Sequence, residues 1–279
     1  DYHNTFKEYR DVKKSFFDSL PKTAFALVNS DDKNGSVMLQ NTLAKKYTYA
    51  LKTMADFKAK ILENQFSGLL LNIDGNEVWT KLIGSFNAYN LLAVYGVASL
   101  LNIDNTEALT EISRLGNVSG RFEYFMSGDG VTAIVDYAHT PDALRNVLET
   151  INDIRTGNEQ VITVVGCGGD RDKAKRPVMG RIASLLSSQV IFTSDNPRSE
   201  NPQTIIEEME TGVDAQNFKK TISVLDREQA IKTAIKFTKK GDIILLAGKG
   251  HETYQEVNGE RSYFSDFEKL SQLLKAIES

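Results

Sequence analysis

The stretch Val131–Asp153, VTAIVDYAHTPDALRNVLETIND, joins a short apolar run to an amphipathic segment, and it decides the fold class. The run VTAIVDYA is mostly apolar, as expected of a strand that is buried in a sheet. Thr140 is a suitable helix cap, and Pro141 suits the first turn of the helix that follows. The apolar residues of that helix share one face: Leu144, Val147, Leu148 and Ile151. The stretch therefore predicts one buried strand followed by one amphipathic helix.

The same succession of strand and helix repeats as far as the end of the chain. Further strands are predicted at QVITVVG (160–166), QVIFTSD (189–195), TISVLD (221–226) and DIILLAG (242–248). Amphipathic helices are predicted between them, and a last helix begins at Ser265, with Glu268 placed to form a capping box. Apolar strands that alternate with amphipathic helices indicate a parallel sheet covered on both faces. We therefore expect an α/β fold, with a doubly wound, mostly parallel, Rossmann-like sheet in residues 119–279.

Residues 1–118 show a different pattern, which predicts an α+β domain. Their middle part alternates between apolar and polar residues and contains the turn sequence Asp74-Gly75-Asn76, so antiparallel strands are expected there. The expected elements are a charged helix at about 5–18, a strand at 23–32, antiparallel strands at 55–84 and helices at about 87–100 and 106–115. The stretch 114–122, RLGNVSGRF, is the best candidate for a linker between the two parts.

Composition restricts the classes of protein to be considered. Of the 279 residues, 41% are hydrophobic and 25% charged, as in an ordinary soluble protein of one or two domains. The formal net charge of −4 gives no electrostatic reason to expect a nucleic-acid partner. The single cysteine, Cys167, cannot form an internal disulfide, which fits a reducing compartment. No apolar run approaches the roughly 18 residues that cross a bilayer, so we expect a cytoplasmic protein without a membrane partner.

Polar residues collect where the predicted parallel strands end. The segments at four of these ends are VDYAHTPD (135–142), GCGGDRD (166–172), SDNPR (194–198) and AGKGHE (247–252). They hold two of the three histidines, the cysteine, and many acidic, basic and amide side chains. In an open parallel sheet, ligands bind beyond the carboxyl ends of the strands. We therefore expect the four segments to converge at one edge of the sheet and to form a ligand site.

Each segment also has an interpretation without function. GCGGD could be only a tight turn between a strand and a helix, because it lacks the complete G-x-G-x-x-G spacing of a dinucleotide site. GKGHE lacks the G-x-x-x-x-G-K-[ST] spacing of a phosphate loop, which occurs nowhere in the chain. His139 and His251 could be ordinary loop residues, and Lys173 and Lys175 are expected to be solvated. The sequence also lacks a zinc-binding Cys/His spacing and a Gly-x-Ser-x-Gly elbow.

Four motifs together resemble those of a known family. DYAHTPDAL (136–144), GCGGDRDKAKRP (166–177), DNPRSENP (195–202) and GKGHE (248–252), in this order and at this spacing, resemble the Mur ligase family. Upstream, DYHNTFKEYRDVKKSFF, GSFNAYNLLA and SGRFE are similar to its central domain and to the junction with its last domain. The resemblance implies that residues 1–118 are the C-terminal part of the central ATP-binding domain, and residues 119–279 the C-terminal, amino-acid-binding domain.

The same resemblance implies that part of the protein precedes residue 1. Members of the family have a domain for the uridine nucleotide and a Gly-Lys-Thr phosphate loop before the region matched here. The first residues are too charged for a signal peptide, and the chain does not begin with methionine. We therefore expect a fragment that lacks these parts and does not catalyse the ligation alone.

The resemblance implies an ATP-dependent carbon–nitrogen ligase of peptidoglycan precursor synthesis. Within the family, the motifs are most similar to those of ligases that add meso-diaminopimelate to UDP-MurNAc-L-Ala-D-Glu. Such an enzyme activates a carboxylate as an acyl phosphate, which the amine of the amino acid attacks. ATP and Mg2+ are the implied cofactors, since positive charge must neutralise the transferring phosphoryl group. Both substrates are small molecules, and a monomer is expected.

The resemblance also implies which residues bind the nucleotide. Asn87 and Asn90, three residues apart on one face of a predicted helix, would read a purine edge. Arg121 would approach the phosphates and Asp136 the ribose, and His139 would belong to the same site.

Lys13 corresponds in this resemblance to the carbamylated lysine of the family. Addition of CO2 to the uncharged amine would turn a cation into an oxygen ligand, which suits a hard cation such as Mg2+. From the sequence alone, an exposed helix lysine beside Lys14 is the simpler interpretation, and only the surrounding motif favours the modified residue. The other protein ligands of the metal are expected upstream of residue 1.

The amino-acid site is predicted at the remaining motifs. meso-Diaminopimelate has a distal carboxylate and a distal ammonium, and the enzyme must hold both. Arg198 offers a planar, bidentate donor to the carboxylate, with Arg171 as a second clamp. Glu252 can accept a hydrogen bond from the ammonium, and glycine at position 248 lets the backbone approach the ligand. The predicted set is Arg171, Asp195, Asn196, Arg198, Gly248 and Glu252.

Three other functions remain open at this point. A relative that adds L-lysine is disfavoured by Arg198, because L-lysine has no distal carboxylate and such relatives do not have arginine there. A non-catalytic module that only binds an amino acid would use the same site. A nucleotide-dependent oxidoreductase is suggested by the strand–GCGG–helix pattern, but its fingerprint is incomplete.

Overall fold

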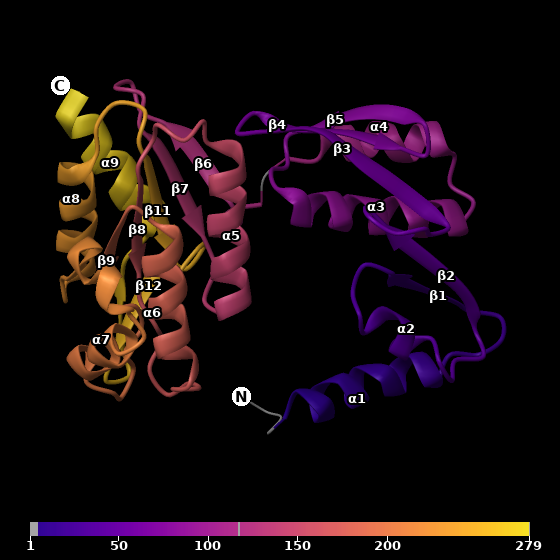
Figure 1. Cartoon of the computed structure of the whole chain (residues 1–279), viewed down its shortest axis with the longest axis horizontal. Coiled ribbons are helices and arrows are strands. Elements are labelled where there is room, and N and C mark those ends of the chain that lie inside the picture. The colour runs from indigo at the N-terminus through magenta and orange to yellow at the C-terminus, as the bar shows by residue number, and fades with distance from the viewer. Residues whose placement is uncertain (1–4, 117, 279) are drawn as a thin grey trace. The chain divides into compact units, whose positions relative to one another are not determined.

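The structure of the chain is a computed structural model that describes residues 5–116 and 118–278. Contacts within the chain divide it into two compact units, Asp1–Gly116 (unit 1) and Asn117–Ser279 (unit 2). Figure 1 shows both units, coloured from indigo at the N-terminus to yellow at the C-terminus. The division falls inside the stretch 114–122 that the sequence suggests as a linker.

The described part of unit 2 is built on a six-stranded sheet in the order β10-β9-β8-β11-β7-β6. The strands are β6 (Glu123–Met126), β7 (Thr132–Asp136), β8 (Val161–Val165), β9 (Gln189–Phe192), β10 (Thr221–Ser223) and β11 (Ile243–Ala247). Neighbouring strands are parallel throughout, except that β6 is antiparallel to β7. The predicted α/β fold with a mostly parallel sheet is therefore confirmed.

The central strands of this sheet end at the same level. β11 lies between β7 and β8, and its last residue, Ala247, pairs with Asp136 of β7 and Val165 of β8. Val165 in turn pairs with Phe192 at the end of β9. These four residues form one row across the sheet, so the loops that follow them begin side by side.

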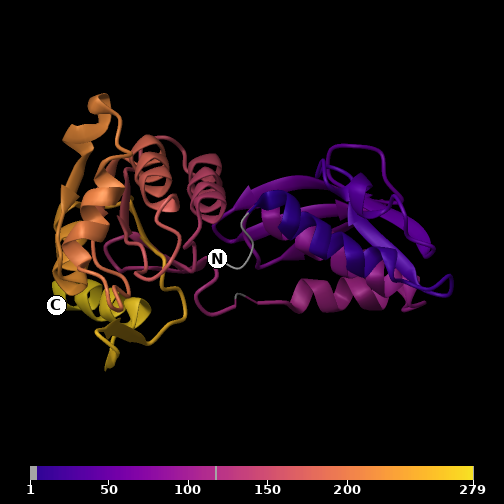
Figure 2. The same cartoon turned by 90° about the horizontal axis from the view of Figure 1, so that it is seen from below.

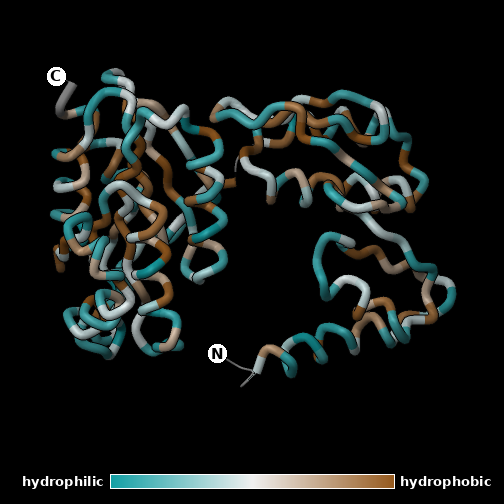
Figure 3. The backbone as a smooth tube through the Cα atoms, viewed as in Figure 1, coloured by the Kyte–Doolittle hydropathy of each residue, from teal (hydrophilic) through white to brown (hydrophobic). Residues whose placement is uncertain are grey.

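Helices cover both faces of the sheet (Figures 1 and 2). One layer consists of α5 (Pro141–Ile154), α6 (Lys175–Leu186) and α7 (Pro202–Glu210), and the other of α8 (Arg227–Phe237) and α9 (Asp266–Glu278). Every residue of β7, β8 and β11 is buried between these layers, and Figure 3 shows the strands as the hydrophobic centre of the unit. In the described part of the chain, no helix is long and apolar enough to cross a membrane.

Helix α5 illustrates how the local sequence fixes these elements. The hydroxyl of Thr140 accepts a hydrogen bond from Ala143 N (3.3 Å), and Pro141 occupies the first turn. All four apolar residues predicted for one helix face are buried: Leu144, Val147, Leu148 and Ile151. The strand and helix predicted from Val131–Asp153 are therefore confirmed.

The described part of unit 1 contains a five-stranded sheet in the order β1-β2-β3-β4-β5. The strands are β1 (Phe25–Asn29), β2 (Lys45–Ala50), β3 (Phe57–Gln65), β4 (Gly68–Ile73) and β5 (Asn76–Thr80). The helices are α1 (Phe6–Asp18), α2 (Gly35–Met38), α3 (Ser85–Leu100) and α4 (Asn105–Arg114). β1, β2 and β3 are parallel, whereas β3, β4 and β5 are antiparallel as predicted. Their apolar faces pack against α3 and α4.

The sequence pattern does not predict β2, β6, or the hairpin of β12 (Tyr254–Val257) and β13 (Glu260–Tyr263). Every residue of β13 is exposed, and the first residues of β2 are exposed too. Without a buried face, a strand has no reason to alternate between apolar and polar residues. A 3-10 helix, η1 (Ala215–Lys220), is also unpredicted.

A buried ion pair joins the two helices of one layer to the carboxyl ends of the strands. Arg227 Nε and Nη2 donate to the two carboxylate oxygens of Asp266, at 2.8 and 2.6 Å, and both side chains are 0% exposed. The same guanidinium donates to Ser194 O (3.4 Å) and Ala247 O (3.3 Å). Arg227 therefore satisfies backbone carbonyls where β9 and β11 end.

We expect Arg227→Met to lower the free energy of unfolding by about 3–5 kcal/mol, because it leaves the Asp266 carboxylate buried without its partner. Arg227→Met/Asp266→Leu should recover most of this loss. Urea unfolding of the chain measures both. Arg114→Met, which removes an exposed ion pair with Glu111, is the control and should change stability little. A small effect of Arg227→Met would contradict the role given to this pair.

Candidate functional site

The four predicted segments lie together at the carboxyl edge of the unit 2 sheet. Gly169 N donates to Asn196 O (2.9 Å), which joins the loops after β8 and β9. Gly248 N donates to Asp136 O (3.0 Å), which joins the ends of β7 and β11. Asn196 Nδ2 donates to Glu252 Oε2 (2.8 Å), which joins the loops after β9 and β11. Residues more than a hundred positions apart thus form one rim.

Arg198 is held in an unusual backbone conformation. Its φ angle is +52°, a left-handed value that costs free energy in a residue with a side chain. Its backbone N donates to Glu256 O (3.1 Å), and its carbonyl accepts from Asn258 N (2.7 Å), so the β12–β13 hairpin fixes this conformation. The guanidinium Nη1 donates to Gly169 O (2.8 Å). The arginine is therefore positioned by backbone contacts on both sides.

Arg171 and Arg198 approach the same glycine. A Cβ atom placed on Gly168 would lie 2.9 Å from Arg198 Nη1 and 3.9 Å from Arg171 Cγ. Arg198 is half-buried, whereas Arg171 is exposed. Two guanidinium-bearing side chains beside one glycine can together receive a carboxylate.

Asn196 links the predicted carboxylate of Glu252 to Lys249, a residue that is not in the predicted set. Its side chain is 3% exposed, and its Nδ2 donates to Glu252. Its Oδ1 accepts from Lys249 Nζ (3.2 Å) and from Glu256 N (3.0 Å). These contacts fix the orientation of the amide. Lys249 itself is 0% exposed.

Asp195 and Gly248 meet beneath this group. Gly248 has a φ angle of +117°, and a Cβ atom there would lie 2.8 Å from Asp195 Oδ2. Only glycine therefore fits this position without moving the carboxylate. Asp195 Oδ1 is buried and has no hydrogen-bond partner among the described residues, with Lys249 Nζ at 3.6 Å.

A second buried cation, also absent from the predicted set, fixes the loop that carries Arg198. Arg176 is 0% exposed and donates to Glu200 Oε1 (2.8 Å) and Glu208 Oε2 (2.6 Å). Hydrogen bonding from Arg176 lowers the pKa of Glu200 to about 2. Glu200 also accepts from Asp170 N (2.6 Å), so the acid of the SENP segment ties the loops after β8 and β9 together.

The unit 2 residues predicted to bind the nucleotide lie around Tyr137. Asp136 is 7% exposed, its Oδ2 accepts from Phe122 N (2.7 Å), and burial raises its pKa to about 6. The guanidinium carbon of Arg121 lies 4.8 Å from the centroid of the Tyr137 ring. His139 Nδ1 is 2.8 Å from Tyr137 O, and the two rings are 4.5 Å apart. Arg121 and His139 are exposed, as ligand-binding groups need to be.

The unit 1 candidates lie on two helices. Asn87 and Asn90 share a face of α3, and Asn90 Nδ2 donates to Asn87 Oδ1 (3.3 Å). Lys13 is exposed on α1, with its Nζ 4.6 Å from the centroid of the Tyr9 ring. The described residues contain no group of three or more His, Cys, Asp or Glu side chains that could hold a metal ion.

Asp31, which the sequence analysis did not select, ties α3 to the sheet edge of unit 1. Its carboxylate accepts from Leu51 N, Lys52 N and Thr53 N at 2.8–2.9 Å and from Tyr89 Oη at 2.8 Å. Burial alone would raise the pKa of Asp31, but these hydrogen bonds hold it well below its usual range. Tyr89 lies between Asn87 and Asn90, so this contact fixes the turn that carries both asparagines.

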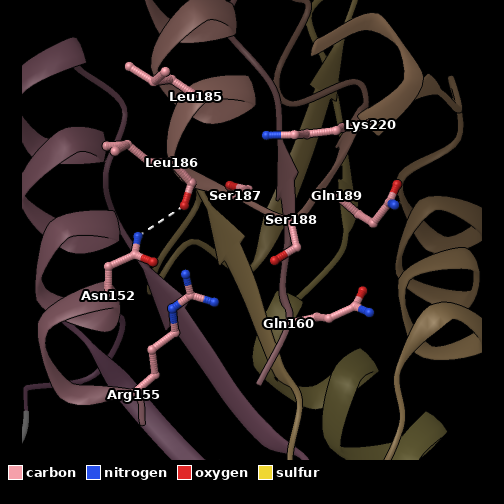
Figure 4. Close-up of a pocket in the computed structure, with 9 residues that line it drawn as sticks. All are labelled: Asn152, Arg155, Gln160, Leu185, Leu186, Ser187, Ser188, Gln189 and Lys220. Atoms are coloured by element: carbon pink, nitrogen blue, oxygen red, sulfur yellow. Dashed lines mark hydrogen bonds between the residues drawn. The ribbon is translucent and has the colours of Figure 1, made fainter. Parts of the chain in front are cut away.

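A cavity of about 610 Å³ opens at the opposite edge of the unit 2 sheet (Figure 4). It is lined by Asn152, Arg155, Gln160, Leu185, Leu186, Ser187, Ser188, Gln189 and Lys220. Arg155 Nη1 donates to Glu159 O (2.7 Å), and Lys220 Nζ to Ser184 O (3.5 Å) near the end of α6. Both cations therefore donate to backbone carbonyls, Lys220 in the last turn of α6 and Arg155 in the loop before β8. The cavity includes none of the predicted site residues.

Two family models match the chain. The Mur ligase middle domain matches residues 1–98, and the Mur ligase, glutamate ligase domain, matches residues 120–250. The chain belongs to the Mur ligase family. The resemblance seen in the four motifs is confirmed at the level of the family. In this Mur ligase chain, all four motifs fall within unit 2.

Named relatives match the Mur ligase chain over nearly its whole length. It is 56% identical over 277 residues to the UDP-N-acetylmuramoyl-L-alanyl-D-glutamate--2,6-diaminopimelate ligase of Cytophaga hutchinsonii, covering 99% of this chain and 57% of the relative. It is 42% identical over 281 residues to the ligase of the same name from Bacillus velezensis, covering 96% and 56%. The chain thus spans a little more than half the length of these relatives.

Solved structures agree with the fold. A UDP-N-acetylmuramoyl-L-alanyl-D-glutamate--2,6-diaminopimelate ligase superposes with a TM-score of 0.64 at 35% identity, covering 100% of this chain and 58% of that one. A MurF ligase from Thermotoga maritima in complex with ADP gives a TM-score of 0.71 at 17% identity, covering 99% and 58%. The second likeness concerns the fold alone.

The raised pKa of Asp136 predicts how stability changes with pH. The folded protein binds this proton more tightly than the unfolded chain, whose carboxyl has an ordinary pKa near 3.8. Stability due to this group therefore increases as the pH falls from about 7 through 6 towards 4. Relative to Asp136→Asn, which cannot titrate, the protein should gain up to about 3 kcal/mol over this range.

Urea unfolding at several pH values measures this difference. A difference between the protein and Asp136→Asn that stayed constant from pH 7.5 to 4.5 would refute the effect of burial.

Proposed function

We propose that the chain is part of an ATP-dependent ligase that adds meso-diaminopimelate to UDP-MurNAc-L-Ala-D-Glu in peptidoglycan precursor synthesis. The names of relatives 42–56% identical to the chain support this activity. The chain spans 57% of the first relative's length, so we propose the complete reaction for a ligase of which this chain is one part. We propose a monomer with small-molecule substrates in the cytoplasm, where a free thiol such as that of Cys167 persists.

The two units correspond, in this proposal, to the later part of the central ATP-binding domain and to the amino-acid-binding domain. Asn87 and Asn90 would bind the adenine, and the hydrogen bond between Tyr89 and Asp31 holds their helix. Arg121 would donate to the phosphates, with Asp136 at the ribose and His139 beside it. The Asp136 carboxylate also fixes the backbone next to Arg121 through Phe122 N.

Mg2+ is proposed with Lys13 as its one ligand from this chain. Lys13 is exposed, so CO2 can reach its amine, and the carbamate would supply the oxygen atoms that Mg2+ prefers. The described ranges contain no cluster of three acidic, His or Cys side chains, and the family resemblance implies that the remaining ligands lie upstream of residue 1. Mg2+ supplies positive charge to the phosphate oxygens.

The amino-acid site carries the proposal. Arg198 and Arg171, which both approach Gly168, would receive the distal carboxylate of meso-diaminopimelate. Glu252 would accept from the distal ammonium, with Asp195 and Asn196 beside it and the Gly248 backbone at close range. Pairing of a carboxylate with a guanidinium is strong and directional. A ligand with both distal groups therefore fits better than one with a single group.

The position of Arg198 separates this function from the addition of L-lysine. L-Lysine has a distal ammonium but no distal carboxylate, so it would offer neither arginine a carboxylate. Hairpin contacts hold Arg198 at a positive φ angle, which costs free energy. Because such strain is found mainly at functional sites, these contacts support a ligand-binding role for the guanidinium. The same contacts would serve a module that only binds the amino acid. An ATP-dependent ligase activity of the full-length protein would distinguish the proposed enzyme from such a module.

Isothermal titration calorimetry of the chain with meso-diaminopimelate and with L-lysine tests the proposal. We expect binding of meso-diaminopimelate and much weaker binding of L-lysine. Arg198→Ala should weaken meso-diaminopimelate binding about ten- to a hundredfold, since hydrogen bonds to charged groups contribute about 1.5–3 kcal/mol.

Arg181→Ala provides a matched control, because Arg181 is an exposed arginine on α6 whose partner is Asp214. It should leave binding unchanged. Equal affinity for the two amino acids, or unaltered affinity after Arg198→Ala, would remove diaminopimelate as the substrate.

A further inference from the structure

Lys249 is a buried cation that the reaction described above does not use. It lies between two glycines in the loop after β11, and its side chain is 0% exposed. Its Nζ lies 3.2 Å from Asn196 Oδ1, 3.5 Å from Glu252 Oε2 and 3.6 Å from Asp195 Oδ1. The ring of Tyr254 is 5.5 Å away. A buried lysine is costly unless opposite charges surround it.

The charges around Lys249 do not balance. Asp195 and Glu252 carry two negative charges, and their side chains are only 8% and 17% exposed. Lys249 supplies one positive charge, and nearby Arg227 is already paired with Asp266. The group formed by Asp195, Lys249 and Glu252 therefore has a net charge of −1. A single further cation would neutralise it.

One acceptor in the same group is also unused. Asp195 Oδ1 is buried without a hydrogen-bond partner among the described residues. An unsatisfied buried carboxylate oxygen costs free energy, and an ammonium donor would remove that cost. One ammonium would therefore both neutralise the net charge of the group and donate a hydrogen bond to the acceptor Asp195 Oδ1.

Lys249 is not needed to orient Asn196. Glu256 N also donates to Asn196 Oδ1, at 3.0 Å, and this contact alone keeps Nδ2 directed towards Glu252. The contribution of Lys249 is therefore mainly its charge.

We propose that Lys249 is a positioning residue that sets the charge of the group formed by Asp195, Lys249 and Glu252 to −1, so that this part of the amino-acid site selects a ligand with one distal ammonium. This inference rests on the proposed function. Without the lysine, the two carboxylates would hold a charge of −2. With one carboxylate neutralised, the group would carry no net charge and would lose its preference for an ammonium over an uncharged group.

The test compares two amino acids by calorimetry on the chain. meso-Diaminopimelate has the distal ammonium, whereas 2-aminopimelate has the distal carboxylate but no distal ammonium. Asp195→Asn brings the charge of the group to zero, and we expect it to weaken meso-diaminopimelate binding about tenfold or more while affecting 2-aminopimelate little. Asp195→Asn/Lys249→Met returns the charge to −1.

Removal of the lysine should therefore strengthen binding in this background. We expect Asp195→Asn/Lys249→Met to bind meso-diaminopimelate to within about threefold of the original chain, and to regain the preference over 2-aminopimelate. Asp195→Asn/Lys220→Met has the same total charge but changes a lysine at the opposite edge of the sheet. It should show no recovery.

A purely structural lysine gives the opposite result, because its removal would weaken binding further or leave it unchanged in the Asp195→Asn background. Thermal unfolding shows whether each variant is folded. If Lys249→Met prevents folding, Lys249→Gln keeps a polar end group and carries the same expectation. Failure of the original chain to bind meso-diaminopimelate would instead reject the proposed function, and this inference with it.

Discussion

The level ends of four parallel strands are the constraint on which the site depends. Asp136, Ala247, Val165 and Phe192 form one row across the sheet of unit 2, and a buried core on both faces holds that register. A shift by one residue would turn every strand side chain to the other face, which the apolar layers do not allow. The loops that follow therefore start from fixed points, and they bring polar side chains from distant parts of the sequence to one edge of the sheet.

Buried cations then connect those loops. Arg227, Arg176 and Lys249 are each 0% exposed, and each contacts acidic side chains at or near the carboxyl edge. A buried ion pair adds little net stability compared with apolar packing. Removal of one partner, however, leaves an unpaired buried charge and lowers stability strongly. Such pairs suit an edge where loops must keep one geometry. Arg227 is balanced by Asp266, and Arg176 and Lys173 together are balanced by Glu200 and Glu208. The surroundings of Lys249 instead keep an excess negative charge for a ligand.

Much of this arrangement follows from the sequence, and the rest depends on contacts between distant residues. The apolar strands, the caps such as Thr140 and the convergence of polar segments are properties of local pattern and of parallel topology. The hairpin that fixes Arg198 has an exposed strand and no pattern to reveal it. The burial of Lys249 was also missed, because lysine is normally solvated. A lysine between glycines, directly after a strand as apolar as β11, is the signal that could have indicated it.

The two halves of the proposed chemistry differ in how they are assembled. All the residues proposed for the amino acid lie in unit 2, where backbone hydrogen bonds and buried charges hold them before any ligand arrives. A preorganised site loses less entropy on binding. The residues proposed for the nucleotide are held less firmly, since Arg121 and His139 are exposed beside Tyr137. Recognition of the amino acid can therefore be a property of unit 2 alone.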